Sequence, residues 1–277
     1  MHQSFISFKN FRSLKSSVVL CVAVLGIYVI AEPLSTSSGG TWLGYVGGSL
    51  GGVLMVWLAC LGIRKRKYKN TELLAVGWVS THIYLGTALL LVVSLHSGFH
   101  LGLNIHSLAY AFTVMVILTG FYGLYAYSIY PDKITLNRDG MSRDSMFAEI
   151  TEIDEKCLAL SEKISPEIFA KISENVEETK IKTSLLTRLF SDSNLKAGAI
   201  YTAMDFIREQ QRHTDSGSEL IRELDSLLLE KATLVGRIEH DIRYHFRLSW
   251  WLYLHVPLTV GALLCLLIHV YVVLFYW

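Results

Sequence analysis

The chain has 277 residues, of which 52% are hydrophobic and only 18% are charged, and its mean hydropathy is +0.39. The formal net charge is +1, but 17 of the 25 Lys and Arg residues and 22 of the 24 Asp and Glu residues fall between positions 131 and 248. No basic stripe with interleaved aromatic residues occurs, which excludes a nucleic-acid partner. The composition therefore predicts an all-α integral membrane bundle of about five transmembrane helices with a helical cytoplasmic insert.

The first apolar run, 18–31, follows a short basic stretch. Such a run also suits a secretory signal, but we expect a retained anchor helix that forms region 1–41 together with an outer loop. The second run, 42–63, contains glycines four residues apart, a spacing that lets helix backbones approach closely. Gly48 and Gly62 stand fourteen positions apart and are candidates for facing flat macrocycles, although helix packing alone is the simpler interpretation.

Two further runs, 74–96 and 105–130, complete the first part of the membrane bundle, which we assign to residues 42–130. A basic cluster at 64–69 precedes them, and basic loops tend to stay in the cytoplasm. This rule places the N-terminus, the 64–69 loop and the 131–248 insert inside, and the C-terminus outside. We therefore expect a protein embedded in membrane lipid, in a bacterial inner membrane.

The 131–248 insert has a helical pattern. Ser165, Pro166 and Glu167 are typical of a helix N-cap followed by proline in the first turn. Later apolar residues recur at heptad spacing, which predicts a long helix that continues into the membrane. That series comprises Ile221, Leu224, Leu228, Val235, Ile238 and Ile242, with the polar Lys231 among them. The apolar stripe suits either a docking face for a redox partner or a self-packed helical hairpin.

The last apolar run, in region 249–277, places His255 and His269 fourteen positions apart, and the 74–96 run places His82 and His96 at the same spacing. Fourteen helical steps span about 21 Å and return a side chain to within about 40° of its starting face. One helix separates the two runs, so both cross the membrane in the same direction. His82 should therefore lie at the level of His255, and His96 at the level of His269.

Two matched histidine pairs within apolar sequence predict two bis-histidine sites for b-type haem. Histidines in hydrocarbon are costly and usually functional, and bis-histidine haem needs two facing neutral imidazoles. His82 and His255 would bind the inner haem iron, and His96 and His269 the outer one. A proton relay or another metal is the alternative, but zinc would lack further ligands.

This pattern resembles the di-haem membrane cytochromes b, most closely the ferric-reductase-like transmembrane family. The resemblance covers roughly residues 42–130 and 249–277 and rests on the four histidines and their topology. It implies that these histidines are axial ligands and that electrons pass between the two membrane faces. The chain departs from the family in its long insert, and it contains neither a sixth helix nor a flavin- or nicotinamide-binding domain.

Haem propionates bind cations, and basic residues near the inner level are candidates for this contact: Arg64, Arg66, Arg243 and Arg247. The loops expected outside contain no Lys or Arg. His106 is therefore a candidate for an outer propionate or a quinone contact, although an interfacial histidine at a helix start is the simpler interpretation.

We expect a cytochrome b subunit that carries electrons across the bilayer through two haems b, as part of an oxidoreductase rather than as a complete enzyme. Its partners would be other redox subunits, such as a flavoprotein, an iron–sulfur protein or a c-type cytochrome. One alternative is a quinone-reactive subunit. The other is a non-redox membrane adaptor that recruits partners through its cytoplasmic helices.

Overall fold

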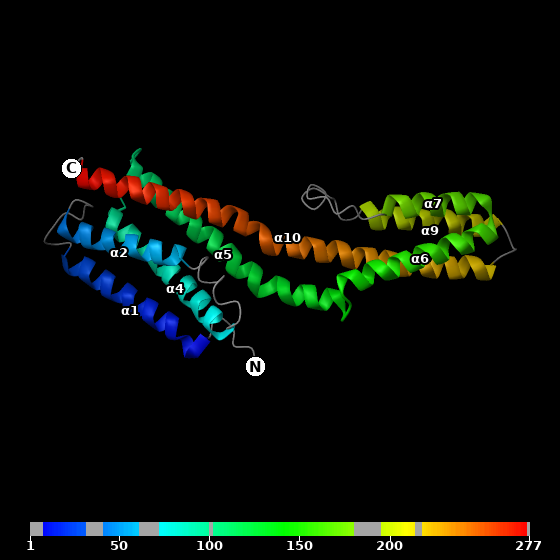
Figure 1. Cartoon of the computed structure of the whole chain (residues 1–277), viewed down its shortest axis with the longest axis horizontal. Helices are drawn as coiled ribbons and strands as arrows, with labels where there is room; N and C mark the ends of the chain where they lie inside the picture. The colour runs from blue at the N-terminus through cyan, green and yellow to red at the C-terminus, as the bar shows by residue number, and fades with distance from the viewer. Residues whose placement is uncertain are drawn as a thin grey trace. The chain divides into compact units, whose positions relative to one another are not determined.

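The computed structural model describes residues 8–31, 41–60, 72–99, 102–179, 195–213 and 218–275. Every regular element in these ranges is a helix, which confirms the all-α prediction for this part of the chain (Figure 1). The helices form two compact units: unit 1 comprises residues 1–125 and 251–277, and unit 2 comprises residues 126–250. The elements are α1 (Phe8–Ala31), α2 (Trp42–Ala59), α4 (Glu72–Ser97), α5 (Ile105–Arg138), α6 (Arg143–Ile164), α7 (Pro166–Thr179), α9 (Leu195–His213) and α10 (Ser218–Phe275).

In unit 1, α4 lies between α1 and α2 and packs against both (Figure 1). Its face towards α2 buries Leu89 and Val92, and both contact the position of Gly51 on α2. On its other side, the hydroxyl of Ser17 on α1 donates to the carbonyl of Tyr84 at 2.7 Å. These contacts make α4 the central helix of this group.

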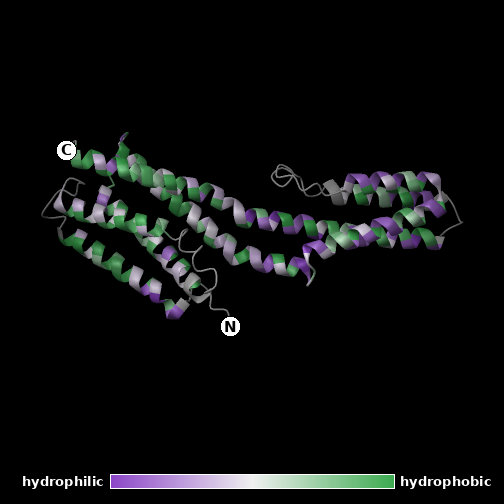
Figure 2. Cartoon of the chain, viewed as in Figure 1, coloured by the Kyte–Doolittle hydropathy of each residue, from purple (hydrophilic) through white to green (hydrophobic). Residues whose placement is uncertain are grey.

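Five stretches of the described chain are long and apolar enough to cross a membrane. They lie in α1, α2, α4, the segment Ile105–Ile164 that begins with α5, and α10. Large apolar side chains of unit 1 are exposed, including Ile30 at 75%, Val53 at 68% and Leu267 at 65%, and Figure 2 shows the C-terminal part of α10 as almost wholly hydrophobic. Such a surface suits lipid rather than water, so the structure is compatible with an integral membrane protein.

Helix α5 extends past the apolar run predicted for it. It continues through Pro131 to Arg138, although proline offers no N–H for the helical hydrogen bond. The helix ends where Asp139 and Gly140 adopt φ values of 50° and 81°. Glycine adopts this backbone conformation without a steric penalty, and Gly140 supplies the break between α5 and α6.

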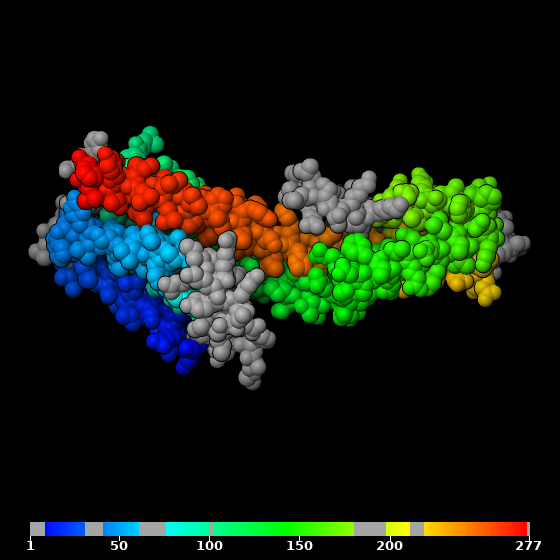
Figure 3. Space-filling model, viewed as in Figure 1, coloured from blue at the N-terminus to red at the C-terminus, as the bar shows by residue number. Residues whose placement is uncertain are grey.

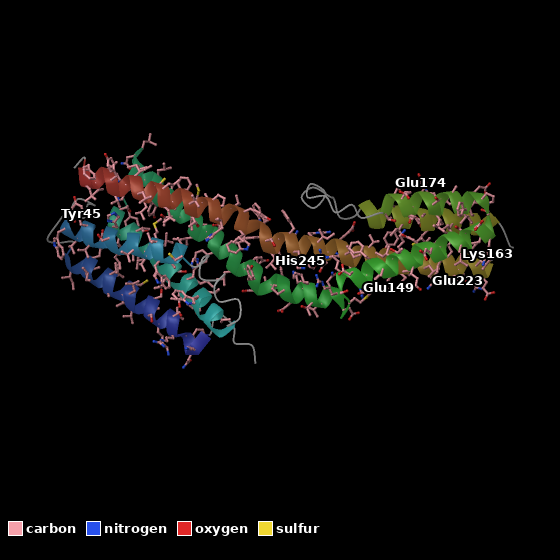
Figure 4. The ribbon with its side chains drawn as sticks, viewed as in Figure 1. Tyr45, Glu149, Lys163, Glu174, Glu223 and His245 are labelled. Carbon is pink, nitrogen blue, oxygen red and sulfur yellow. The ribbon has the colours of Figure 1, made fainter. Side chains whose placement is uncertain are left out.

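Unit 2 contains the end of α5, the helices α6, α7 and α9, and the first part of α10. Helix α7 packs against α6 and α9, and in Figure 3 α6 and α7 form one continuous surface. The core is apolar, with Met146, Ile172 and Met204 at most 1% exposed. Charged residues such as Lys163 and Glu174 are exposed (Figure 4). Unit 2 therefore has the pattern of a water-soluble helical bundle.

The predicted N-cap and the predicted long helix are both confirmed. The hydroxyl oxygen of Ser165 accepts a hydrogen bond from the Ile168 N–H at 3.2 Å, and α7 begins at Pro166. Helix α10 is continuous over 58 residues. Its heptad residues pack against side chains of α6, α7 and α9 and are buried, except that Ile242 is partly buried, so the chain itself covers the apolar stripe. This packing favours the self-packed interpretation over an open docking face.

Candidate functional site

The four histidines of the two apolar segments, His82, His96, His255 and His269, form two facing pairs in unit 1. The ring centres of His82 on α4 and His255 on α10 lie 6.5 Å apart, with ring planes at 62°. The ring centres of His96 and His269, on the same two helices, lie 6.0 Å apart with planes at 90°. These are the pairs that the fourteen-residue spacing predicts. That these two histidine pairs are axial ligands of iron remains a prediction.

Helices α2 and α5 fix two of these rings through the nitrogen Nδ1. His96 Nδ1 lies 2.8 Å from the carbonyl oxygen of Gly44, and His255 Nδ1 lies 2.9 Å from Thr119 Oγ1. The Thr119 hydroxyl donates to the Val116 carbonyl at 2.8 Å, so its oxygen accepts from the histidine. A histidine that donates from Nδ1 keeps the lone pair of Nε2 for a metal.

A third histidine, His106, contacts Nδ1 of His269. The two Nδ1 atoms lie 2.5 Å apart, and the two ring planes are nearly perpendicular, at 89°. His106 is the second residue of α5. It is thus placed to orient His269, a contact that the sequence analysis did not anticipate, and its proposed contacts with a propionate or a quinone stay predictions.

His82 differs from the other three. Its Nδ1 is buried, and no acceptor in the described part of the chain reaches it with hydrogen-bond geometry. The backbone of Leu58 interacts with this ring only outside that geometry. The Leu58 carbonyl already accepts the N–H of Cys60 at the end of α2. Leu58 and Gly44 stand fourteen positions apart, so the two α2 carbonyls repeat the spacing of the histidines that they face.

Glycines allow the rings to approach the neighbouring helices. A Cβ atom on Gly48 would lie 2.7 Å from Cε1 of His96, which is closer than van der Waals contact allows. Gly48 therefore faces the imidazole of His96, and its predicted contact with a macrocycle is untested. On α5, a Cβ on Gly123 would lie 3.0 Å from the indole of Trp251, whose ring centre is 5.2 Å from that of His255.

The separation of the paired rings suits a bis-imidazole iron site. Two iron–nitrogen bonds of about 2 Å, with about 1 Å from each nitrogen to its ring centre, place facing imidazole centres about 6 Å apart. The observed separations are 6.5 and 6.0 Å. Across the described ranges, no group of three or more His, Cys, Asp and Glu side chains is placed to hold a metal ion. Two protein ligands are all that haem iron requires, because the macrocycle supplies four nitrogens.

Five other residues were predicted to contact the haems. Gly62, Arg64 and Arg66 fall outside the described residues. Arg243 and Arg247 lie on α10 within unit 2, and their contact with haem propionates stays a prediction.

Unit 2 holds buried charges of a different kind. Asp241 is fully buried and accepts from Arg138 Nε at 2.6 Å and from Arg143 Nε at 2.9 Å. Burial alone would raise the pKa of Asp241, but the bonds from the two arginines outweigh burial and hold that pKa below its ordinary value. His245 Nε2 accepts from Arg138 at 3.1 Å, and burial lowers the pKa of His245. These contacts join α5, α6 and α10 within the unit, and Figure 4 labels His245 on α10.

A second buried charge lies in the core of unit 2. Lys231 has no exposed surface, and its Nζ lies 2.6 Å from Asp154 Oδ1 and 3.0 Å from Asn175 Oδ1. Burial raises the pKa of the nearby Cys157 thiol to about 12, so this cysteine stays protonated and unreactive. Both features are structural parts of the helical core.

The hydrogen-bond partners of the histidines were not predicted from the sequence. Gly44 contributes a backbone carbonyl, which leaves no signal in residue type. Thr119 and His106 stand thirteen positions apart on α5, close to the fourteen-residue interval of the histidine pairs. This spacing is a sequence signal that matches their positions.

Comparisons of the chain with protein-family models, curated proteins and solved structures gave no match. Its function is therefore inferred from its own residues and their geometry.

Proposed function

We propose that the chain is a membrane cytochrome b subunit that holds two haems b and carries electrons across the bilayer between redox partners on its two sides. The observation that supports this most directly is the pair of facing imidazole sites, 6.5 and 6.0 Å between ring centres, built from the same two helices. A histidine in an apolar span is costly. Two matched pairs of them suggest a bound ligand, and the ring separations support bis-histidine haem as that ligand.

The protein's part would be ligation, orientation and exclusion of water. His82 and His255 would hold one iron, and His96 and His269 the other, from rigid helices. When bound, each haem supplies one-electron redox chemistry. The contacts from Gly44 and Thr119 keep the Nδ1–H of their histidines engaged, so that the Nε2 atoms remain available.

Charge distribution supports one orientation in the membrane. The basic cluster at 64–69 and the charge-rich 131–248 segment favour the cytoplasmic side for both. The C-terminus would then lie outside, in a bacterial inner membrane, and the 82–255 site would be the inner one. Donor and acceptor would be other redox subunits, in keeping with the resemblance to the ferric-reductase-like transmembrane family.

The test is a haem count by pyridine haemochrome, with a dithionite-reduced minus oxidised spectrum, on purified full-length protein from haem-replete cells. We expect two b haems in the wild type and one in each of His96→Ala and His255→Ala. His240→Ala, which alters a histidine of α10 in unit 2, should keep both.

Double variants test the pairing itself. His96→Ala with His269→Ala removes one site and should leave one haem, whereas His96→Ala with His255→Ala damages both sites and should leave none. A haem-free wild-type protein would refute the proposal and favour the non-redox adaptor.

A further inference from the structure

Helix α5 gives each of the two α10 histidines one partner, and the two partners differ in chemistry. His106 offers an imidazole nitrogen to Nδ1 of His269, at 2.5 Å. Thr119 offers a hydroxyl oxygen to Nδ1 of His255, at 2.9 Å. Both contacts involve the same ring nitrogen of residues fourteen positions apart on one helix, so they form a matched comparison.

A stronger hydrogen-bond acceptor at Nδ1 makes the histidine a stronger iron ligand through Nε2. Neutral imidazole is a base with a pKa of about 6.5 for its protonated form, and it accepts a hydrogen bond more strongly than an alcohol oxygen does. An Nδ1–H that donates strongly leaves more electron density on Nε2 and makes the ring a more basic ligand. A more basic axial ligand stabilises ferric over ferrous iron, which lowers the reduction potential.

The hydrogen-bond acceptors at Nδ1 of the two α4 histidines differ in the same direction, with the stronger one in the 96–269 pair. Nδ1 of His96 has the carbonyl of Gly44 at 2.8 Å. Nδ1 of His82 is buried and, among the described residues, has no acceptor in hydrogen-bond geometry. Both rings of the 96–269 pair therefore have a close hydrogen-bond acceptor at Nδ1. Among the described residues only His255 of the 82–255 pair has one, since the backbone of Leu58 meets His82 outside hydrogen-bond geometry.

We infer that the haem held by His96 and His269 has the lower reduction potential of the two, so that electrons pass from it to the haem held by His82 and His255. The inference rests on the proposed function. With the expected orientation, electrons enter from a reductant at the outer face and leave to an oxidant at the cytoplasmic face.

A potentiometric titration of the purified di-haem protein tests this order. His96→Ala retains the 82–255 site, and we expect its single wave to coincide with the higher wave of the wild type. His255→Ala retains the other site and should show the lower wave. Coincident or reversed waves in a protein with two haems would overturn the inference and leave the proposed function standing. A wild type without haem would overturn both.

Substitution of the two α5 partners tests the cause. His106→Phe should raise the lower wave by about 59 mV, a tenfold change in the ratio of ferrous to ferric haem. His106→Gln should shift it less, because an amide oxygen still accepts a hydrogen bond, and it decides the matter where the phenylalanine variant loses haem. Thr119→Val is the matched control and should raise only the higher wave, by less. An unmoved lower wave in both His106 variants would overturn the role of His106 as the cause of the lower potential.

Discussion

The two units of this protein enclose different kinds of polar group. In unit 1 the polar side chains of the site are partly buried histidines that face one another and contact neutral acceptors, namely a carbonyl, a hydroxyl and another imidazole. In unit 2 they are charges, with Asp241 between two arginines and Lys231 between Asp154 and Asn175. A charge inside a protein needs compensation by an opposite charge and hydrogen bonds, and the two arginines, Asp154 and Asn175 provide it in unit 2.

Their surfaces differ in the opposite sense. Unit 1 exposes large apolar side chains, such as Val19 at 68% and Leu267 at 65%, whereas unit 2 keeps Ile200 and Ile238 at 0%. Unit 1 therefore has an apolar surface around its partly buried histidines, whereas unit 2 has an apolar core that also holds buried charges. The difference matches two solvents, lipid for unit 1 and water for unit 2.

Leu228→Ala, in the core of unit 2, is expected to cause the largest loss in the free energy of unfolding. Leu228 is 1% exposed on the heptad face of α10, so its truncation removes buried apolar surface and leaves a cavity, at a cost of about 2–5 kcal/mol. The adjacent Leu229 is 50% exposed, and Leu229→Ala should cost about 0.5 kcal/mol or less. Urea unfolding of the full-length protein, followed by circular dichroism, measures both. Equal losses would mean that the stripe is not covered by the chain itself.

Asp241→Asn comes next and probes the buried charge of unit 2. The variant leaves two arginines without their carboxylate, and we expect a loss of about 3 kcal/mol at pH 7, the low end for a buried pair because both arginines are partly exposed.

The effect of this substitution depends on pH with a definite sign. The pKa of Asp241 is lower in the folded than in the unfolded protein, so the ionised carboxylate stabilises unit 2 above the ordinary carboxyl pKa of about 4 and loses this effect as pH falls through the lowered value. The difference in urea midpoint between wild type and variant should therefore shrink at pH 3. A difference that grows with acidity would contradict this account.

Gly48→Ala tests how closely unit 1 constrains its histidines. The new methyl group would lie 2.7 Å from Cε1 of His96, so the ring must move away from the Gly44 carbonyl. Loss of such an orienting contact typically costs about 10- to 100-fold in metal affinity, and we expect that loss at the 96–269 site alone, measured as haem occupancy during haem titration. Gly52→Ala is the control, because its methyl would meet Leu266 at an ordinary 3.8 Å.

The smallest effect is expected at the surface of unit 2. Lys156 and Glu152 form an ion pair at 2.7 Å with both side chains more than half exposed. Solvent screening leaves such pairs nearly neutral in free energy, so Lys156→Gln should leave the urea midpoint unchanged within error. A clear loss would show that exposed charges stabilise unit 2 as well as buried ones.

The sequence was sufficient for features that depend on local spacing. Serine followed by proline predicted the start of α7 because the hydroxyl of Ser165 can reach an N–H three residues on. Heptad spacing predicted the buried face of α10, since helical geometry puts such residues on one side. The fourteen-residue interval predicted which histidines would lie opposite each other. Two helices that run in the same direction place residues of the same depth side by side.

Only the tertiary structure determined which residues contact each of these groups. Lys231 stood in an apolar series, and its acceptors Asp154 and Asn175 come from α6 and α7, far away in sequence. The acceptors of His96 and His269 likewise come from α2 and α5. Helix periodicity states which side of a helix a residue occupies, but the identity of the group that it meets depends on which helices pack together. The chemistry expected at the two histidine pairs therefore follows from sequence, whereas the difference between them follows from packing.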